Sequence, residues 1–154
     1  MNLELKRELE LKAKGSPPIH VLFVEDEFLI SEWVAQALSE QGFAVQAVGN
    51  AADALRALNS EPVDVLFTDI NLPGDMDGAA LARRAREMQP RLPVVYASAR
   101  SNMLNPADRV PGSSFVPKPY EPAFVGRLLA ALLKAVEAGA PAESIIRKSG
   151  YRFS

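Results

Sequence analysis

The sequence contains no cysteine and only one histidine, His20, among its 154 residues. A chain without cysteine forms no disulfide, no thiolate zinc site, no iron–sulfur cluster and no cysteine nucleophile. The histidine has no partner motif, so we expect it to be structural. Among metal sites, this inventory leaves a site for a hard cation with oxygen ligands.

Long apolar runs and a strong charge of one sign are also missing. No window approaches the roughly 18 apolar residues of a membrane span, and residues 1–8 are too charged for a secretory signal. We therefore expect a cytoplasmic protein that does not bind membranes. The net charge is −2, and residues 15–138 hold 10 basic and 15 acidic residues, which gives no electrostatic basis for binding nucleic acid.

The length and the hydrophobic content of 48% fit one globular domain with short additions. The segment Gly15-Ser16-Pro17-Pro18 breaks the chain near its start. We expect an N-terminal extension with a helix at residues 1–15, a domain at residues 16–138 and a tail at residues 139–154. The tail is too short for an output domain, so we expect the domain to act on its own.

Five short apolar segments predict β-strands, and the segments between them predict helices. Several of the apolar segments lack polar alternation, as strands covered on both faces do. The predicted strands are residues 20–24, 43–48, 63–68, 93–97 and 114–116. Helical periodicity predicts helices at residues 27–41, 51–59, 77–88 and 121–137. The connection at residues 101–112 contains Pro106 and Pro111, so it has room for at most a short fourth helix.

Strands that alternate with helices predict an α/β fold, a doubly wound five-stranded parallel sheet of the flavodoxin-like type with helices on both faces. In the first helix, Ile30, Val34, Ala37 and Leu38 form the apolar face, and we expect Trp33 to pack near it. A doubly wound sheet binds ligands outside the carboxyl ends of its strands, where the strand order reverses. Functional residues are therefore expected at those ends.

Acidic residues follow two of the predicted strands. Glu25-Asp26-Glu27 comes after the first strand and Asp69 after the third. Because these strands are neighbours in a doubly wound sheet, we expect Glu25, Asp26 and Asp69 to converge within a few ångströms. Converging carboxylates need a cation, and Mg²⁺ with oxygen ligands fits best. The backbone carbonyl of Asn71 completes the predicted ligand set.

The fourth and fifth strands add a hydroxyl and an ammonium group to the same edge. Ser98 lies at the end of the fourth strand and Lys118 at the end of the fifth. With the acidic residues, these are the groups needed to make and hold an acyl phosphate. Asp69 would attack phosphorus, Mg²⁺ and Lys118 would offset the charge on the phosphoryl oxygens, and Ser98 would donate a hydrogen bond to one of them.

Four motifs at successive strand ends occur in a familiar order. They are Val24-Glu25-Asp26-Glu27, Phe67-Thr68-Asp69-Ile70-Asn71-Leu72-Pro73-Gly74, Ala97-Ser98-Ala99 and Val116-Pro117-Lys118-Pro119. The sequence over residues 19–137 resembles the receiver domain of two-component response regulators. This resemblance implies a (β/α)₅ receiver fold. It also implies a phosphoacceptor domain that catalyses only its own phosphorylation and dephosphorylation and is not otherwise an enzyme.

The resemblance assigns roles to the acidic residues. It implies that Asp69 takes a phosphoryl group from a histidine kinase or a histidine phosphotransfer protein. It also implies that Glu25, Asp26 and the carbonyl of Asn71 hold Mg²⁺ together with Asp69. The partner after phosphorylation would be a downstream protein or a second copy of the chain.

A second set of implied roles concerns the switch. The resemblance implies that Ser98 and Phe115 form a switch pair, in which the Phe115 ring turns when Ser98 moves toward the phosphoryl group. It also implies a cis peptide bond before Pro119. Two features depart from the family pattern. The segment 98–118 is about two residues shorter than usual and contains two prolines, so its fourth helix should be short or absent. Phe115 lacks the hydroxyl of the tyrosine that often stands at this position.

Two alternatives to a phosphorylated receiver domain remain at the level of sequence. One is a receiver-like interaction module that does not use phosphate, for which the expected sign is an incomplete site. The other is a Toprim-type, magnesium-dependent nucleotidyl enzyme, which also sets a glutamate after its first strand. Its Asp-x-Asp motif appears here as Asp69-Ile70-Asn71, and it leaves Ser98 and Lys118 unexplained.

Overall fold

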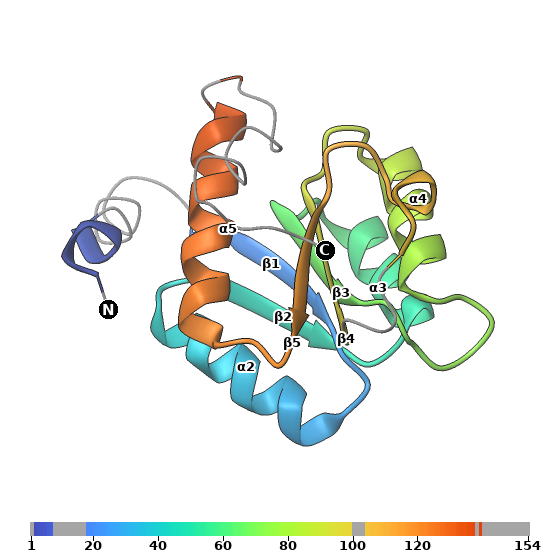
Figure 1. Cartoon of the computed structure of the whole chain (residues 1–154), viewed down its shortest axis with the longest axis horizontal. Helices are drawn as coiled ribbons and strands as arrows, with labels where there is room; N and C mark the ends of the chain where they lie inside the picture. Colours follow the sequence, from blue (N-terminus) through green and yellow to red (C-terminus); the bar gives the residue numbers. More distant parts are fainter. Residues whose placement is uncertain (1, 8–17, 100–103, 138, 140–154) are drawn as a thin grey trace.

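The structure is a computed structural model of the chain, and it describes residues 2–7, 18–99, 104–137 and 139. Strands and helices alternate along the described chain (Figure 1). The elements are β1 (His20–Val24), α2 (Phe28–Glu40), β2 (Ala44–Val48), α3 (Ala51–Ser60), β3 (Val65–Asp69), α4 (Gly78–Met88), β4 (Val94–Ala99), the 3₁₀ helix η2 (Pro106–Asp108), β5 (Ser114–Lys118) and α5 (Pro122–Glu137).

The five strands form one parallel sheet in the order β2-β1-β3-β4-β5. This confirms the predicted α/β fold and its flavodoxin-like strand order. The order reverses between β1 and β3, which pair directly, with Phe23 opposite Phe67 and Val24 opposite Thr68. The carboxyl ends of β1 and β3 therefore lie side by side, which is where the acidic residues were expected.

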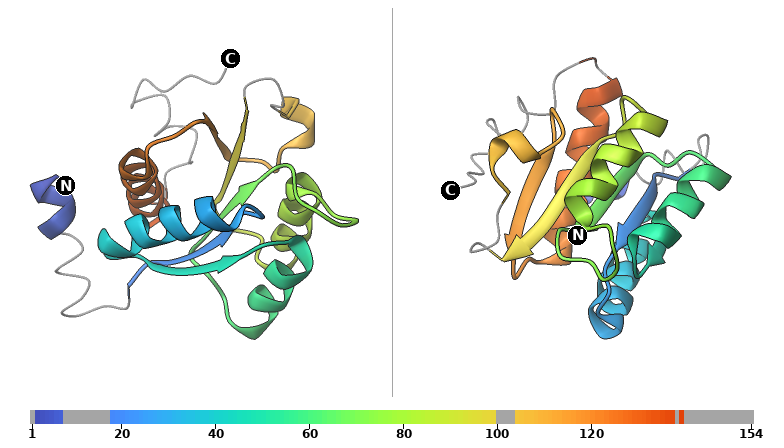
Figure 2. Two further views of the ribbon diagram at one scale, coloured as in Figure 1. Left: turned by 90° about the horizontal axis from the view of Figure 1, so that it is seen from below. Right: turned by 90° about the vertical axis from the view of Figure 1, so that its right-hand side faces the viewer.

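Helices cover both faces of the sheet and divide the core into two layers (Figure 2). On one face, α2 and α5 pack on the strands through Val34, Leu38 and Leu129, among others. On the other face, α3 and α4 pack through residues such as Leu58 and Leu81. Burying a side chain of this size contributes about 1.5–3 kcal/mol. The two layers account for the apolar, non-alternating strands, because both faces of each central strand are covered.

The start of α4 is fixed against the end of β3. The Asp77 side chain caps the helix by accepting a hydrogen bond from the backbone N–H of Ala80 at 2.8 Å. The backbone N–H of Gly78 donates to the carbonyl of Ile70 at 2.7 Å. A Cβ atom on Gly78 would overlap the carbonyl oxygen of Asp69. Glycine is therefore required for this approach, which holds the loop after Asp69 against the sheet.

The connection between β4 and β5 contains one short 3₁₀ turn, η2, among the residues described at 104–113. This agrees with the predicted short fourth helix, although residues 101–103 lie outside the described part. The backbone N–H of Val110 donates to the hydroxyl of Tyr96 at 3.1 Å. The Arg109 side chain donates twice to the carbonyl of Leu104, at 3.1 and 2.9 Å. The first contact ties the connection to β4, and the other two close the connection on itself.

The expectation for Trp33 is wrong, because its side chain is 57% exposed. The buried residues of α2 are Val34 and Leu38. Adjacent residues on an α-helix lie 100° apart, so Trp33 points away from the narrow stripe that these two residues form. Phe28 and Leu29, at the start of the same helix, are also exposed.

The ends of the chain are described only in part. Residues 3–7 are helical, and Leu5 is buried whereas Leu3 is exposed. The rest of the predicted N-terminal helix and the tail from residue 140 lie outside the described residues. The division at residues 15 and 138 therefore stays a prediction. Within the described ranges, no helix has the length and apolar character that a bilayer crossing requires.

Candidate functional site

Three carboxylates meet at the carboxyl ends of β1 and β3. Glu25 and Asp26 follow β1, and Asp69 is the last residue of β3. Each offers an oxygen atom, and these atoms lie within 4.8 Å of one another. Glu25 and Asp69 are buried, with 3% and 7% of their surface exposed, while Asp26 is exposed. The predicted convergence of these three residues is therefore confirmed.

Lys118, the last residue of β5, reaches both buried carboxylates. Its Nζ donates to Asp69 Oδ2 at 3.0 Å and to Glu25 Oε1 at 3.1 Å. Strand β4 lies between β3 and β5, and it places Ala97 opposite Asp69 and Ala99 opposite Lys118. Because alanine side chains are small, they leave room for the lysine side chain to extend across β4. The ammonium group thus joins an acidic cluster that lies two strands away.

Burial and charge shift the pKa values of Glu25 and Lys118. Burial raises the pKa of Glu25, and the nearby charge of Asp69 adds to this rise. The backbone N–H of Glu27 and the ammonium of Lys118 lower the pKa of Glu25, but by less. Burial lowers the pKa of Lys118, yet the hydrogen bonds and charges of Asp69 and Glu25 outweigh it and raise the pKa overall. Burial is therefore the main reason why the folded protein disfavours the ionised form of Glu25.

The raised pKa of Glu25 predicts that Glu25→Gln will stabilise the protein in the absence of metal. Because the folded environment raises the pKa of Glu25, it disfavours the ionised side chain that is present at neutral pH. The neutral amide should raise the free energy of unfolding by about 1 kcal/mol. Urea denaturation at pH 7 with a chelator present measures this change.

Glu27→Gln is the matched control for this experiment. The Glu27 side chain is exposed, and the variant removes the same charge two residues away. It should change the free energy of unfolding by less than about 0.5 kcal/mol. A Glu25→Gln variant that is less stable than Glu27→Gln would contradict the electrostatic interpretation.

The acidic cluster has the chemistry of a site for a hard divalent cation. All three side chains offer carboxylate oxygens, which are the ligands that Mg²⁺ prefers. Two buried carboxylates and the exposed Asp26 share the single ammonium of Lys118. The cluster therefore fits Mg²⁺. Asn71, two residues after Asp69, is exposed, and the role of its carbonyl stays a prediction.

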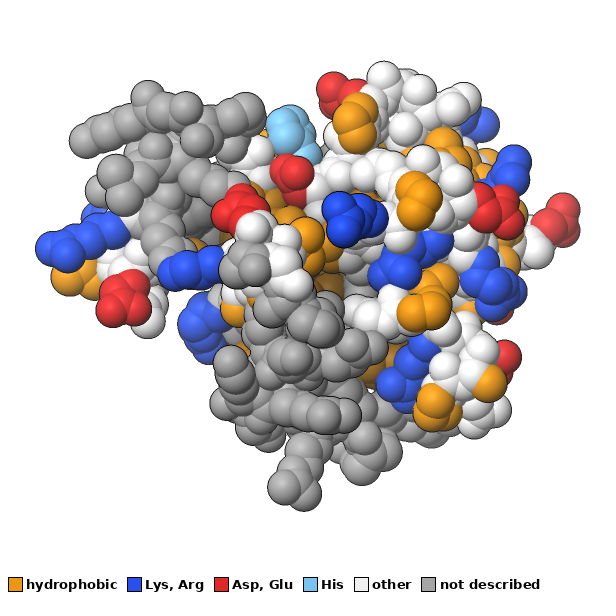
Figure 3. Space-filling model, turned by 90° about the horizontal axis from the view of Figure 1, so that it is seen from above, with side chains coloured by type: hydrophobic (Ala, Val, Ile, Leu, Met, Phe, Trp, Pro, Cys, Tyr) orange, Lys and Arg blue, Asp and Glu red, His pale blue; other side chains and the backbone are white. Residues whose placement is uncertain are grey.

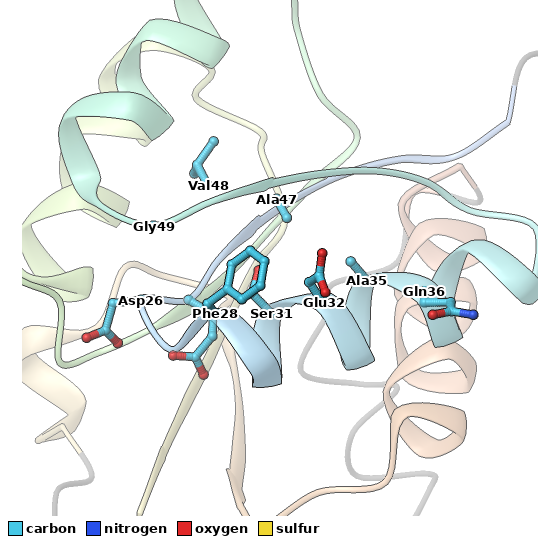
Figure 4. Close-up of a pocket in the computed structure, with 10 residues that line it drawn as sticks. Asp26, Phe28, Ser31, Glu32, Ala35, Gln36, Ala47, Val48 and Gly49 are labelled. Atoms are coloured by element: carbon cyan, nitrogen blue, oxygen red, sulfur yellow. The ribbon is translucent and has the colours of Figure 1, made fainter.

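A groove opens beside this cluster, between α2 and β2 (Figure 4). Asp26 and Phe28 lie at one end, and Gln36 lies further along α2. Ala47 and Val48 of β2 line the other side. The acidic cluster is thus open to solvent along one side.

Comparison with known proteins identifies the family. A profile of the response regulator receiver domain matches residues 21–132. The chain belongs to the response regulator receiver domain family. Receiver domains are phosphoacceptor signalling domains of two-component systems rather than conventional enzymes. As a family they bind Mg²⁺ at an acidic pocket and interact with histidine kinases and downstream effectors.

The receiver domain has curated relatives among transcriptional regulators. It is 36% identical over 121 residues to the transcriptional regulatory protein TctD of Salmonella typhimurium, an alignment that covers 75% of this chain and 52% of TctD. It is 32% identical over 142 residues to the transcriptional regulatory protein TrcR of Mycobacterium tuberculosis, covering 88% of this chain and 53% of TrcR. The chain spans about half the length of these relatives.

Solved structures agree with this assignment. A crystal structure of a response regulator receiver protein from Sinorhizobium medicae is 32% identical, with a TM-score of 0.72 over 77% of this chain and 96% of that chain. A CheY-like receiver domain protein from Methanospirillum hungatei has a TM-score of 0.70 at 20% identity, over 80% of this chain and 100% of that chain. The latter supports the fold alone. The family match favours a receiver domain over a nucleotidyl enzyme.

The two predicted switch residues of the receiver domain are both buried. Ser98 is 1% exposed at the end of β4, and Phe115 is 0% exposed on β5. The Phe115 ring lies 6.3 Å from the ring of Tyr96, and the guanidinium of Arg109 lies 5.1 Å above the Phe115 ring. The cis peptide bond implied by the family is present between Lys118 and Pro119.

Sequence reasoning missed one polar residue near the site of the receiver domain. Tyr120 packs its ring 5.5 Å from the ring of Phe67. Its hydroxyl is buried and has no hydrogen-bond partner among the described residues. Burial raises the pKa of Tyr120, and the charges of Glu25 and Asp69 raise it further. The only sequence signal was its position directly after Pro119, where an aromatic residue gives no hint of an unpaired hydroxyl.

This hydroxyl predicts that Tyr120→Phe will stabilise the receiver domain. A buried polar group without a partner costs about 1–3 kcal/mol, and phenylalanine keeps the ring that packs on Phe67. We expect the free energy of unfolding to rise by about 1 kcal/mol, as measured by urea denaturation. Tyr96→Phe is the control, because the Tyr96 hydroxyl accepts a hydrogen bond from Val110. That variant should lose stability, and a loss of stability in Tyr120→Phe would contradict the prediction.

Proposed function

We propose that Asp69 is the phosphoacceptor of this receiver domain. The observation that carries the proposal is the contact of the Lys118 ammonium with both Asp69 and Glu25, next to Asp26. This arrangement gives a nucleophilic carboxylate at a strand end, a fixed positive charge beside it and further oxygen ligands for a cation. All the parts needed for an acyl phosphate are present, which argues against a receiver-like module that does not use phosphate.

In the proposed reaction, an oxygen of the Asp69 carboxylate attacks the phosphorus of a phosphohistidine. The new bond joins this oxygen to phosphorus, and the bond from phosphorus to the donor nitrogen breaks. The imidazole leaves with the electron pair of that bond. Lys118 holds Asp69 in place and offsets the charge on the phosphoryl oxygens, and Ser98 donates a hydrogen bond to one of them.

Glu25, Asp26, Asp69 and the carbonyl of Asn71 would hold Mg²⁺. A bound Mg²⁺ supplies positive charge that stabilises the transferring phosphoryl group. The protein provides oxygen ligands on rigid strand ends, and it provides Lys118 as a second positive charge. Removing any of the three carboxylates should therefore weaken Mg²⁺ binding more than removing an exposed carboxylate elsewhere.

The proposed switch uses Ser98 and Phe115. Phosphorylation would draw the Ser98 hydroxyl toward the phosphoryl group and free space into which the Phe115 ring can turn. Arg109 lies over the Phe115 ring and donates a hydrogen bond to the carbonyl of Leu104. A rotation of the ring would therefore displace Arg109 and, with it, the connection between β4 and β5. The readout rests on ring packing, because Phe115 has no hydroxyl.

For the partners, we propose a histidine kinase or a histidine phosphotransfer protein as donor, and a downstream protein or a second copy as target. Three properties of the domain stay predictions: that it acts on its own, that it lies in the cytoplasm, and that it binds neither membrane nor nucleic acid. The relatives named transcriptional regulators are about twice as long as the matched region, and their full-length activities are statements about those proteins.

Backbone NMR with Mg²⁺ and beryllofluoride tests the proposed function. Beryllofluoride mimics a phosphoryl group on a carboxylate. We expect shifts at Asp69, Ser98 and Phe115 that need both Mg²⁺ and beryllofluoride and that disappear in Asp26→Ala. Unchanged spectra in the wild type would reject the phosphoacceptor assignment. Shifts that persist in Asp26→Ala would reject the ligand assignment only.

A further inference from the structure

Charge is divided unevenly along this chain. Residues 19–77 contain eleven acidic residues and one arginine, whereas residues 78–118 contain seven basic and two acidic residues. The first segment forms β1, α2, β2, α3 and β3, and the second forms α4, β4, η2 and β5. Because the sheet order is β2-β1-β3-β4-β5, one edge of the molecule is acidic and the other is basic.

The basic edge has a face formed by Arg83, Arg86 and Arg109, which we call the basic face. Arg83 and Arg86 lie one turn apart on α4, where Arg83 is exposed and Arg86 is half-buried. Arg109 lies over the ring of Phe115, which neighbours the ring of Tyr96. Burial raises the pKa of Tyr96, and the charges of all three arginines act to lower it. In the described part of the chain, no carboxylate forms an ion pair with any of them. Figure 3 shows basic side chains gathered on the side of the molecule where α4 lies.

Two of the three arginines of the basic face are held in place by contacts within the domain. Arg86 donates from Nε to the carbonyl of Leu92 at 2.6 Å. Arg109 is fixed by its two bonds to Leu104 and by its stacking on Phe115. Positive charges that are positioned and unpaired form a surface that is complementary to acidic side chains.

The acidic edge carries an exposed face with three large apolar side chains and one carboxylate. It is formed by Phe28, Leu29, Glu32 and Trp33, and we call it the α2 face. At 100° per residue these four positions span an arc of about 140° on the helix. Phe28 is 70% exposed, Leu29 79% and Trp33 57%. Large apolar side chains grouped at this exposure indicate an interaction surface.

The two faces lie on opposite sides of the molecule. Helix α2 packs with α5 on one side of the sheet, and α4 packs with α3 on the other. Figure 1 shows α2 at the lower left and α4 at the right. One molecule can therefore use both faces at the same time, each with a different neighbour.

We propose that the basic face of one copy docks on the α2 face of a second copy. The charge complementarity is present within this one sequence, because Arg83 on one side meets Glu32 on the other. The apolar residues of the α2 face supply area that can be buried beneath the aliphatic parts of the arginines. Such a contact joins two different surfaces, so it repeats head to tail and does not close as a two-fold dimer.

Sedimentation velocity of the full chain, without phosphodonor, tests this proposal. At about 20 mM salt the average mass should rise above 16.7 kDa with concentration and should continue past the dimer. At about 0.5 M salt the protein should return to a monomer, because exposed charges are screened. Arg83→Glu and Glu32→Lys should each weaken self-association by about tenfold or more. Lys134→Glu and Glu121→Lys, the same charge changes on exposed positions of α5 and its start, should leave it unchanged.

Mixing the two impaired variants gives the decisive result. Arg83→Glu keeps an intact α2 face, and Glu32→Lys keeps an intact basic face. Their mixture should form a one-to-one dimer that grows no further, because each variant has one working face. A wild type that stays monomeric at low salt would overturn the proposal, as would association that salt and Arg83→Glu do not affect, or a mixture that remains monomeric. These results are independent of the phosphoacceptor assignment, since no phosphoryl group is involved.

Discussion

Asp69→Asn is expected to abolish phosphorylation by a small-molecule phosphodonor such as acetyl phosphate in the presence of Mg²⁺. The amide keeps the shape of the side chain and its place beside Lys118, but it is not a nucleophile for phosphorus. We expect incorporation to fall by a factor of 10² or more, roughly the range for removing a reacting group. Intact-protein mass spectrometry measures the added phosphoryl group directly, and its lability to hydroxylamine identifies an acyl phosphate.

Asp75→Asn provides the control for this result. Asp75 is an exposed aspartate in the loop between β3 and α4, so the variant makes the same chemical change a few residues away. It should be phosphorylated like the wild type. Phosphorylation of Asp69→Asn at the wild-type level would show that another residue is the acceptor. Loss in both variants would indicate that the loop, rather than the Asp69 carboxylate, is required.

The second large effect is expected for Gly78→Ala, which should destabilise the fold. A Cβ at this position would overlap the carbonyl oxygen of Asp69 and lie 2.8 Å from the Cα of Ile70. Both obstacles are backbone atoms of a strand end, so they cannot move without displacing the site. We expect a loss of about 2–4 kcal/mol in the free energy of unfolding. For a chain of this size, that corresponds to a fall in Tm on the order of 10 °C.

Gly126→Ala is the matched comparison. Its Cβ would overlap the side-chain oxygen of Gln41, which is the end of a flexible side chain. Gln41 would give up its hydrogen bonds to the carbonyls of Ala37 and Pro122, while alanine gains about 1 kcal/mol of helix propensity. The two effects nearly cancel, so stability should stay within about 1 kcal/mol of the wild type. Equal losses in Gly78→Ala and Gly126→Ala would contradict the distinction between backbone and side-chain obstacles.

The acidic site could be predicted from the sequence because it depends on few assumptions. Apolar strands without alternation indicate a sheet covered on both faces, and in a doubly wound sheet the first and third strands are neighbours. Asp26 and Asp69 then meet regardless of how the helices pack. The position of Lys118 follows from the same rule, but its reach to Asp69 also depends on the alanines of β4 that lie between them.

Other features could not be predicted in this way. Whether Trp33 packs or is exposed depends on where α2 rests on the sheet, and a rotation of the helix by one residue reverses the answer. The unpaired hydroxyl of Tyr120 depends on which polar groups reach it from other elements. The requirement for glycine at residue 78 depends on how closely α4 approaches the carbonyl of Asp69. These are distances between elements, which periodicity does not encode.

The sequence alone determined the class of fold, the edge of the sheet where the acidic residues lie and the residues that meet there. These properties follow from local patterns: apolar periodicity, strand-end residues and the parallel order that right-handed crossovers impose. The tertiary structure decided how tightly Glu25 and Asp69 are buried, which side chains on α2 face solvent, and how Arg109 covers Phe115. It also placed the acidic and basic halves of the chain on opposite sides of the molecule, because only the packing of helices on the two faces of the sheet sets which surfaces remain exposed.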